Sequence, residues 1–365
     1  MAYSGTQGTQ GTQGTQGTQG TQGTQGTQGT QGTQGTQGTQ SAGGAAGPYL
    51  SQALATSRDG IARYWTGVGD LARDNAVPGG WDAFRKMQDG PQAAVLDHEL
   101  GAALTLDLPN STTGQVVAPI LGGAAVARLM RPVLNQAFMD AQMPLLRSYS
   151  DLRMDRLAEI QVQSGDIVSF FGALGYLDRV ATKRSLDLIW AVLRLCGRLE
   201  MRLKMHFDLP RPINACPDLQ PVIQTPGHGS WPSGHATEAF AVAALFAALQ
   251  APGPVDAAQL VADRAPVMRL AARIAVNRTV AGVHYPSDSM AGAVLGLAIG
   301  ETIANWLAGE TTTPARSFDG TGWHGDFDLS ALEAVLASSA TAGPLAPPPP
   351  VLVNMWQVAR DEWPR

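Results

Sequence analysis

The chain has 365 residues, of which 15% are charged, and its formal net charge at pH 7 is −5. This acidic balance argues against a general nucleic-acid binder, and two cysteines are too few for a disulfide scaffold or a four-cysteine zinc site. The start, MAYSGTQGTQ, has neither a basic nor an apolar signal region, and no uncharged apolar run reaches the ~18–20 residues of a membrane span. We therefore expect a cytoplasmic protein with no membrane span and no nucleic-acid partner.

Residues 1–48 are predicted to be a disordered tail and linker. From Gly5 to Gln40 the sequence repeats Gly-Thr-Gln twelve times, and residues 41–48 continue with mostly small side chains. Such a tract has no large apolar side chain to bury, so nothing offsets the entropy lost on ordering it. We therefore place the folded part of the chain after residue 48.

Residues 49–308 have the pattern of one helical domain. Apolar residues from Leu186 to Leu199 recur every three or four positions, as in an amphipathic helix. The run 236–250 is almost wholly apolar, which predicts a buried central helix. The helices predicted in this domain lie near residues 153–162, 184–205, 236–250, 265–276 and 287–307.

The predicted fold class is all-α, because strand-like alternation is scarce. We expect a helical bundle whose motif-bearing core spans 184–308. Residues 309–365 are predicted to be a Gly- and Pro-rich C-terminal extension. Its Trp356 and Trp363 could dock on the body or on a second subunit, so a homo-oligomer is one expectation.

Three segments at the ends of the predicted helices combine cationic and imidazole side chains. They are Lys204-x6-Arg211-Pro, Pro-Ser233-Gly234-His235 and Arg278-x5-His284-x3-Asp288. Guanidinium forks suit the oxygens of a tetrahedral oxyanion, and free amides at a helix start favour an anion. Taken singly, each residue has a structural alternative, such as a solvated arginine, a turn or a helix N-terminal charge. Their order and spacing together predict a phosphate-shaped pocket with a reactive histidine.

The third segment places a carboxylate four residues after an imidazole. Asp288 could accept a hydrogen bond from Nδ1 of His284, which would leave Nε2 as the better nucleophile or metal ligand. Gly234 allows a close backbone approach because it has no Cβ. The second histidine, His235, could donate or accept a proton beside the first.

These motifs resemble the signature of the type 2 phosphatidic acid phosphatase (PAP2) and vanadium-dependent haloperoxidase superfamily. All three parts are present, and the one departure is Asn277, where the phosphatase signature usually has serine before the arginine. The resemblance implies a helical bundle of that type. It also implies an oxyanion held by Lys204, Arg211, Ser233, Gly234 and Arg278.

For a phosphatase of this superfamily, the resemblance implies a phosphohistidine formed on His284. His235 would protonate the leaving alcohol and then activate water, and Asp288 would orient the nucleophile. This chemistry needs no cofactor. The connections between the motifs are short, which favours a phosphatase acting on a small-molecule phosphoester.

Two alternatives stay open. In a haloperoxidase the pocket would hold vanadate, with His284 as the one metal ligand and His235 as the acid-base, and the substrates would be halide and hydrogen peroxide. His228 lies seven residues before His235, an offset that resembles the algal bromoperoxidases, although a plain loop histidine is the simpler interpretation. A non-catalytic phosphate-binding protein is the third hypothesis, but binding alone would not need two histidines.

Overall fold

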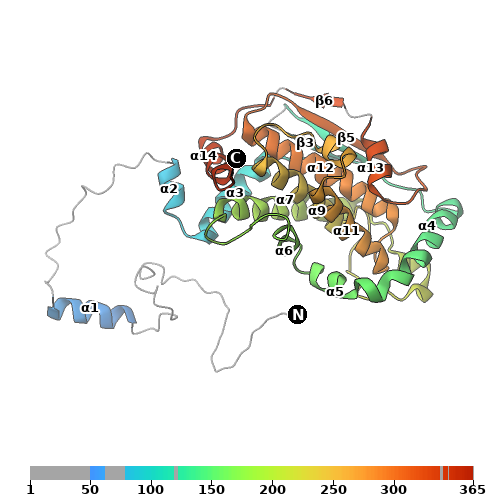
Figure 1. Ribbon diagram of the computed structural model, residues 1–365, viewed down its shortest axis with the longest axis horizontal. Coiled ribbons are helices and arrows are strands. Elements are labelled where there is room, and N and C mark those ends of the chain that lie inside the picture. The colour runs from blue at the N-terminus through green and yellow to red at the C-terminus, as the bar shows by residue number, and fades with distance from the viewer. Residues whose placement is uncertain (1–49, 62–78, 119–121, 338–339, 344, 365) are drawn as a thin grey trace. The chain divides into compact units, whose positions relative to one another are not determined.

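The structure is a computed structural model that describes residues 50–61, 79–118, 122–337, 340–343 and 345–364. The chain divides into two units, Met1–Asn75 and Ala76–Arg365. Helix α1 (Leu50–Ile61) is the described part of the first unit (Figure 1). The predicted tail 1–48 lies outside the described residues.

Four long helices form the centre of the second unit (Figure 1). They are α7 (Lys183–Phe207), α9 (Gly234–Gln250), α11 (Pro266–Val280) and α12 (Pro286–Ala308). Helices α11 and α12 begin with proline, whose fixed φ and missing N–H suit a first helical turn. Helix α7 stops at Asp208, which has a left-handed φ of 42°, just before a Leu-Pro-Arg-Pro sequence that cannot continue a helix. These bounds agree with the predicted helices to within a few residues.

Helices α9 and α12 pack almost backbone to backbone. Helix α12 presents Gly292, Gly296 and Gly300 to α9, and a Cβ at any of them would overlap main-chain atoms of α9. Four-residue spacing keeps these glycines on one face. The close approach joins the first turns of the two helices, where the Ser233 amide donates to the Asp288 carbonyl oxygen at 2.9 Å. Two of the predicted motifs therefore meet because glycine lines this contact.

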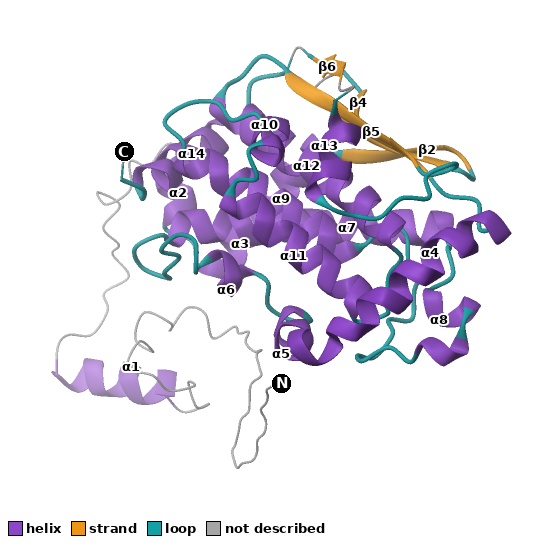
Figure 2. Cartoon of the chain, turned by 45° about the vertical axis from the view of Figure 1, so that its right-hand side comes forward, coloured by secondary structure: helices purple, strands orange, loops and turns teal. Residues whose placement is uncertain are grey.

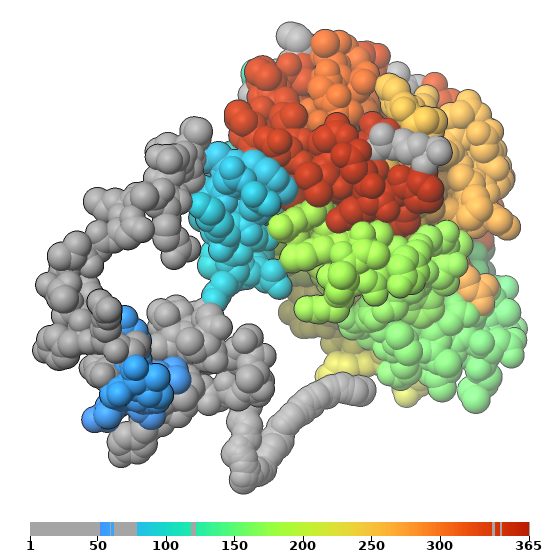
Figure 3. Space-filling model, turned by 60° about the vertical axis from the view of Figure 1, so that its left-hand side comes forward, coloured from blue at the N-terminus to red at the C-terminus, as the bar shows by residue number. Residues whose placement is uncertain are grey.

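Shorter helices surround the central four. They are α2 (Trp81–Arg85), α3 (Asp89–Ala103), α4 (Gln136–Tyr149), α5 (Arg153–Gln163), α6 (Val168–Phe171), α8 (Pro212–Ala215), α10 (Ala257–Ala262), α13 (Leu329–Leu336) and α14 (Pro350–Asp361). The C-terminal segment packs against α7 and α2, and in Figure 3 its red atoms border the cyan atoms of α2 and α3. Trp363, just after α14, donates its Nε1–H to the Ser185 hydroxyl at 2.9 Å.

A five-stranded mixed sheet covers one side of the helices (Figure 2). Its strands, in spatial order, are β2 (Thr105–Asn110), β3 (Thr113–Ala118), β4 (Ala124–Met130), β5 (Thr313–Asp319) and β6 (Ala340–Ala342). The β4–β5 pair is parallel and the others are antiparallel. The helical prediction is confirmed, but the all-α prediction is wrong. The strands are short, and β5 pairs with a strand that precedes all four central helices, so no local pattern signals the sheet.

Helix α12 corrects the prediction that no segment could span a membrane. Its length and composition are sufficient for a span, although 94% of its most apolar window is buried inside this structure. The core helix of a water-soluble protein can meet the same criteria. The sequence argument overlooked α12 because it required an uncharged run, and this helix contains Asp288 and Glu301.

Candidate active site

The three predicted motifs meet at the ends of the central helices. The last turn of α7 carries Lys204, and the first turn of α9 carries Gly234 and His235. The last turn of α11 carries Arg278. The loop between α11 and α12 carries His284, which is only 4% exposed. The site is therefore built from the ends of α7, α9 and α11, the start of α8, where Arg211 is the N-cap, and the loop that follows α11.

His284 and Asp288 form a buried pair. The His284 Nδ1 lies 2.9 Å from Asp288 Oδ2, which also accepts the Tyr285 amide at 3.1 Å. Burial raises the pKa of Asp288 to about 7, while the Tyr285 amide and nearby cations act against this rise. Burial and the neighbouring Arg211 hold the pKa of His284 well below its usual value. A neutral imidazole with its proton on Nδ1 keeps an electron pair on Nε2.

That electron pair faces the Arg211 guanidinium. Arg211 Nη1 lies 3.2 Å from His284 Nε2 and donates to the Val283 carbonyl oxygen at 2.8 Å. Arg211 Nε donates to the His228 carbonyl oxygen at 3.1 Å, and Nη2 lies 3.3 Å from Nδ1 of the same residue. The structure thus places His228 beside Arg211, on an exposed loop at the edge of the site. An oxyanion bound to this guanidinium would lie next to His284 Nε2.

Lys204 is the most enclosed cation of the first motif. Its Nζ donates to the carbonyl oxygens of Ser230 (3.2 Å) and Pro232 (2.5 Å). Burial lowers the pKa of Lys204 to about 8, and the charge of Glu200 one turn earlier acts against this fall. Burial also raises the pKa of Glu200 to about 7. We did not predict Glu200 as a site residue, although an acid four positions before a lysine on a helix is a readable signal.

The Ser233 hydroxyl at the start of α9 is available for a ligand. Ser233 is fully buried and is the N-cap of this helix, but its side chain makes no capping bond. Within the described parts of the chain, its Oγ has no hydrogen-bond partner. A Cβ at Gly234 would lie 2.7 Å from Glu200 Oε1, so a larger residue would displace the Glu200 carboxylate. A buried hydroxyl and a helix N-terminus together favour an anion here.

His235 and Arg278 both face the last turn of α5. His235 Nε2 lies 2.7 Å from the Gln163 carbonyl oxygen. Arg278 Nη2 donates to the Ile160 carbonyl oxygen at 3.1 Å and to Gln163 Oε1 at 3.3 Å. Burial lowers the pKa of His235 to about 3 and that of Arg278 to about 10. No motif in the sequence indicated that α5 would complete the site.

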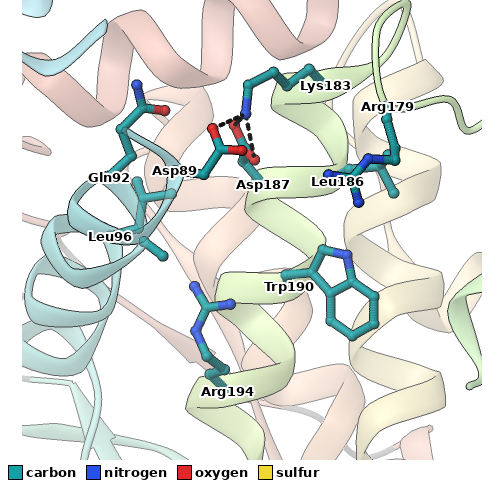
Figure 4. A pocket seen from close by; sticks show the side chains of 10 residues that line it. Asp89, Gln92, Leu96, Arg179, Lys183, Leu186, Asp187, Trp190 and Arg194 are labelled. Atoms are coloured by element: carbon teal, nitrogen blue, oxygen red, sulfur yellow. Dashed lines mark hydrogen bonds and ion pairs between the residues drawn. The ribbon is translucent and has the colours of Figure 1, made fainter. Parts of the chain in front are cut away.

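A hollow lies between α3 and α7, away from the three motifs (Figure 4). Its volume is about 260 Å³, and the half-exposed Trp190 lines it. Lys183 Nζ, another of its charges, lies 2.9 Å from Asp89 and 3.4 Å from Asp187 (Figure 4). Because carboxylates already neutralise this cation, we expect the hollow to bind an anion more weakly than the motif site does.

The described residues contain no cluster of three or more His, Cys, Asp or Glu side chains that could hold a metal ion. The donor set at the motifs instead suits a tetrahedral oxyanion. It combines two guanidinium groups, one ammonium group and the unpaired Ser233 hydroxyl. Phosphate and vanadate have this shape, so either would fit the donors present.

Residues 186–311 match the family model described as the PAP2 superfamily. This match confirms the resemblance inferred from the motifs and spans all of them. No curated protein matches the chain.

One solved structure that the chain resembles is the crystal structure of a transmembrane PAP2 type phosphatidylglycerolphosphate phosphatase from Bacillus subtilis. The two chains are 19% identical with a TM-score of 0.32, and the similarity covers 46% of this chain and 85% of that one. The prediction of a cytoplasmic protein without a membrane span is contradicted, because α12 could span a membrane by length and composition.

Proposed function

From its PAP2-superfamily segment, residues 186–311, we propose that this protein is a phosphatase-type hydrolase of small-molecule phosphoesters that works through a phosphohistidine. The observation that carries the proposal is the buried His284. Its Nδ1 is bonded to Asp288 and its Nε2 faces the Arg211 guanidinium. A nucleophile oriented by a carboxylate and placed beside an anion-binding fork is the arrangement that covalent phosphoryl transfer needs.

In the first step, His284 Nε2 attacks phosphorus. The P–N bond forms, the P–O bond to the alcohol breaks, and the leaving oxygen takes a proton. The proton on His284 Nδ1 stays on the side of Asp288, whose charge offsets the positive charge that develops on the ring. Arg211, Arg278, Lys204 and the Ser233 hydroxyl would hold the three non-bridging oxygens.

His235 is the proposed proton carrier. A carbonyl oxygen only accepts hydrogen bonds, so the 2.7 Å contact with Gln163 requires the proton of the neutral His235 ring on Nε2. Nδ1 is then the nitrogen available to substrate. A bound phosphate dianion favours the protonated ring, because an opposite charge nearby raises an imidazole pKa. His235 can therefore give a proton from Nδ1 to the leaving alcohol.

In the second step, His235 Nδ1 takes a proton from water. The resulting oxygen attacks phosphorus, the P–N bond breaks, and inorganic phosphate and free His284 are formed. The same histidine thus serves as acid in one step and base in the other, which is required when both steps pass through one transition-state geometry. Nothing in this cycle consumes a cofactor.

The proposal is tested by two assays on the same preparation. The unmodified protein should hydrolyse p-nitrophenyl phosphate, and His284→Ala should lose essentially all of this turnover. A His284→Ala variant that keeps full activity would place the chemistry elsewhere. Bromide oxidation that depends on added vanadate and hydrogen peroxide, without hydrolysis, would identify the haloperoxidase alternative. Phosphate binding without either reaction in the unmodified protein would identify a binding protein.

A further inference from the structure

The last turn of α5 contacts two of the proposed site residues, His235 and Arg278, through one residue, Gln163. Gln163 is 1% exposed, and its main-chain carbonyl oxygen accepts from His235. Its side-chain Oε1 accepts from Arg278 Nη2 at 3.3 Å and from Asn277 Nδ2 at 2.9 Å. This residue lies outside the three motifs and outside the family match, which begins at residue 186.

The orientation of the Gln163 carboxamide follows from its hydrogen-bond network, in which the arginine side chains can only donate. A guanidinium can only donate, so the Asn277 atom that lies 2.8 Å from Arg156 Nη1 must be the side-chain oxygen, Oδ1. The Asn277 nitrogen then donates to Glu159 Oε2 at 3.2 Å and to Gln163. The Gln163 atom that receives this bond, and the bond from Arg278, must be its oxygen.

The Gln163 amide nitrogen is consequently left as a buried donor beside Arg278. In the described structure neither Gln163 Nε2 nor Arg278 Nε has a hydrogen-bond partner. Leaving a buried donor unpaired costs about 1–3 kcal/mol, so native proteins rarely do it without a compensating role. Both nitrogens would be satisfied by one oxygen-rich ligand bound at the Arg278 guanidinium.

We propose that Gln163 is a further binding and positioning residue of the site. Its Nε2 donates to a non-bridging oxygen of the tetrahedral anion, its Oε1 steadies the Arg278 fork, and its main-chain carbonyl keeps the His235 proton on Nε2. The inference rests on the proposed phosphoester function and adds a neutral donor to the cationic set. It also gives a reason for the departure from the family signature, because the asparagine at 277 reaches Gln163.

A second interpretation makes the opposite prediction. In this interpretation, oxygens in the last turn of α5 accept the hydrogen bonds of Arg278 and His235 and so compete with substrate for these donors. Removing the Gln163 side chain would then strengthen phosphate binding, because a competitor is lost. If Gln163 instead binds the anion, removing the side chain weakens phosphate binding.

The experiment measures inorganic phosphate binding by calorimetry and p-nitrophenyl phosphate kinetics for Gln163→Ala and Gln163→Glu. Loss of one neutral hydrogen bond should weaken phosphate roughly 3–10-fold and raise KM more than it lowers kcat. The Gln163→Glu variant keeps an oxygen for Arg278 but replaces the donor with a negative charge, so its phosphate affinity should fall further. Gln161→Ala, an exposed change in the same turn, is the matched control and should leave both readouts unchanged.

Coupling to Asn277 separates positioning from general destabilisation. In a double-mutant cycle of phosphate affinities, Gln163→Ala and Asn277→Ser should be less than additive, because both remove the same clamp. Thermal unfolding of each variant checks that the protein is folded at the assay temperature. Strictly additive effects, or Gln163→Ala binding phosphate as tightly as the unmodified protein or more tightly, would overturn the proposal.

Arg211→Ala distinguishes this failure from failure of the proposed function. If the unmodified protein binds phosphate and Arg211→Ala abolishes the binding while Gln163→Ala leaves it intact, the site is real and the inference about Gln163 alone is wrong. If the unmodified protein neither binds phosphate nor hydrolyses the ester, the proposed function is wrong and the inference falls with it.

Discussion

At the scale of single residues, the site is defined by cations held almost without water. Lys204, Arg211 and Arg278 are each at most 2% exposed, and in this structure carbonyl oxygens accept most of their hydrogen bonds. Neutral carbonyls satisfy the donors but carry no negative charge, and burial weakens the compensation from Glu200 and Asp288 by raising the pKa of each to about 7. A dianion would supply that compensation, so the three cations favour phosphate-like ligands over neutral ones.

His235→Ala should lower kcat for an alkyl phosphate ester, whose alkoxide leaving group needs a proton, by about 10²–10⁴-fold, the usual worth of a general acid-base. The deficit should shrink for substrates whose leaving groups need little protonation. His206→Ala is the control, since His206 Nε2 contacts the Asn110 carbonyl oxygen beside the sheet rather than the site. Equal losses for good and poor leaving groups would rule out proton transfer by His235.

The pH dependence of phosphate binding should report Lys204. Its pKa is lowered to about 8 by burial, so the ammonium charge, and with it phosphate affinity, is lost as the pH rises through about 8. The negative charge of Glu200 raises the pKa of Lys204, and Glu200→Gln should therefore move this loss to lower pH, by roughly one unit. Calorimetry between pH 6 and about 9.5 measures the shift.

Glu333→Gln is the matched control for this titration. Glu333 pairs with Arg264 at 2.8 Å on the surface, so its neutralisation should leave the pH profile of phosphate binding unchanged. An unmoved profile in Glu200→Gln would show that the charge of Glu200 is not coupled to the anion site.

At the scale of elements, the contact between α9 and α12 sets the position of the motifs. The Cβ of any larger residue at Gly296 would overlap the α9 main chain, which cannot rotate away as a side chain can. Pushing the helices apart would also stretch the bond from the Ser233 amide to the Asp288 carbonyl oxygen. Fold stability and site geometry therefore depend on the same contact.

Gly296→Ala should lower the free energy of unfolding by about 1–3 kcal/mol, the typical cost of overpacking a core. It should also raise KM, because the α9 start and Asp288 move apart. Gly197→Ala is the matched control. No atom lies within 4 Å of a Cβ built at Gly197 in α7, so alanine there should be neutral or stabilise by up to about 1 kcal/mol. Chemical denaturation of both variants provides the comparison, and equal stabilities would disprove the close contact.

At the scale of the second unit, strand β5 and Trp363 contact the central helices away from the motifs. Strand β5 pairs with β4, and Glu301 of α12 forms a buried ion pair with Arg316 of β5. The Trp363 ring lies 5.4 Å from that of Phe246, which is about 18 Å along α9 from its first residue at 1.5 Å per residue. The C-terminal segment thus stabilises the end of the helices opposite the motifs.

Trp363→Ala should therefore separate stability from catalysis. Losing a buried indole costs about 3–5 kcal/mol, and the bond to the Ser185 hydroxyl is lost with it. Thermal denaturation should show a lower midpoint, while kcat/KM at temperatures where the variant stays folded should be unchanged. Trp190→Ala, a change of the same size at a half-exposed position, should cost less. A large drop in kcat/KM for the folded Trp363→Ala variant would mean that the C-terminal segment reaches the site.

Local patterns in the chain were sufficient for the four central helices and for the resemblance to the PAP2 superfamily, which the match over 186–311 confirms. Helix periodicity, prolines at helix starts and the spacing of arginine, histidine and aspartate are all short-range properties. The five-stranded sheet and the place of Glu200 and Gln163 beside the motifs came from the folded structure alone. Each of these depends on contacts between distant segments, such as α5 with α11 or β4 with β5, and no periodicity within one segment encodes which distant segment it will meet.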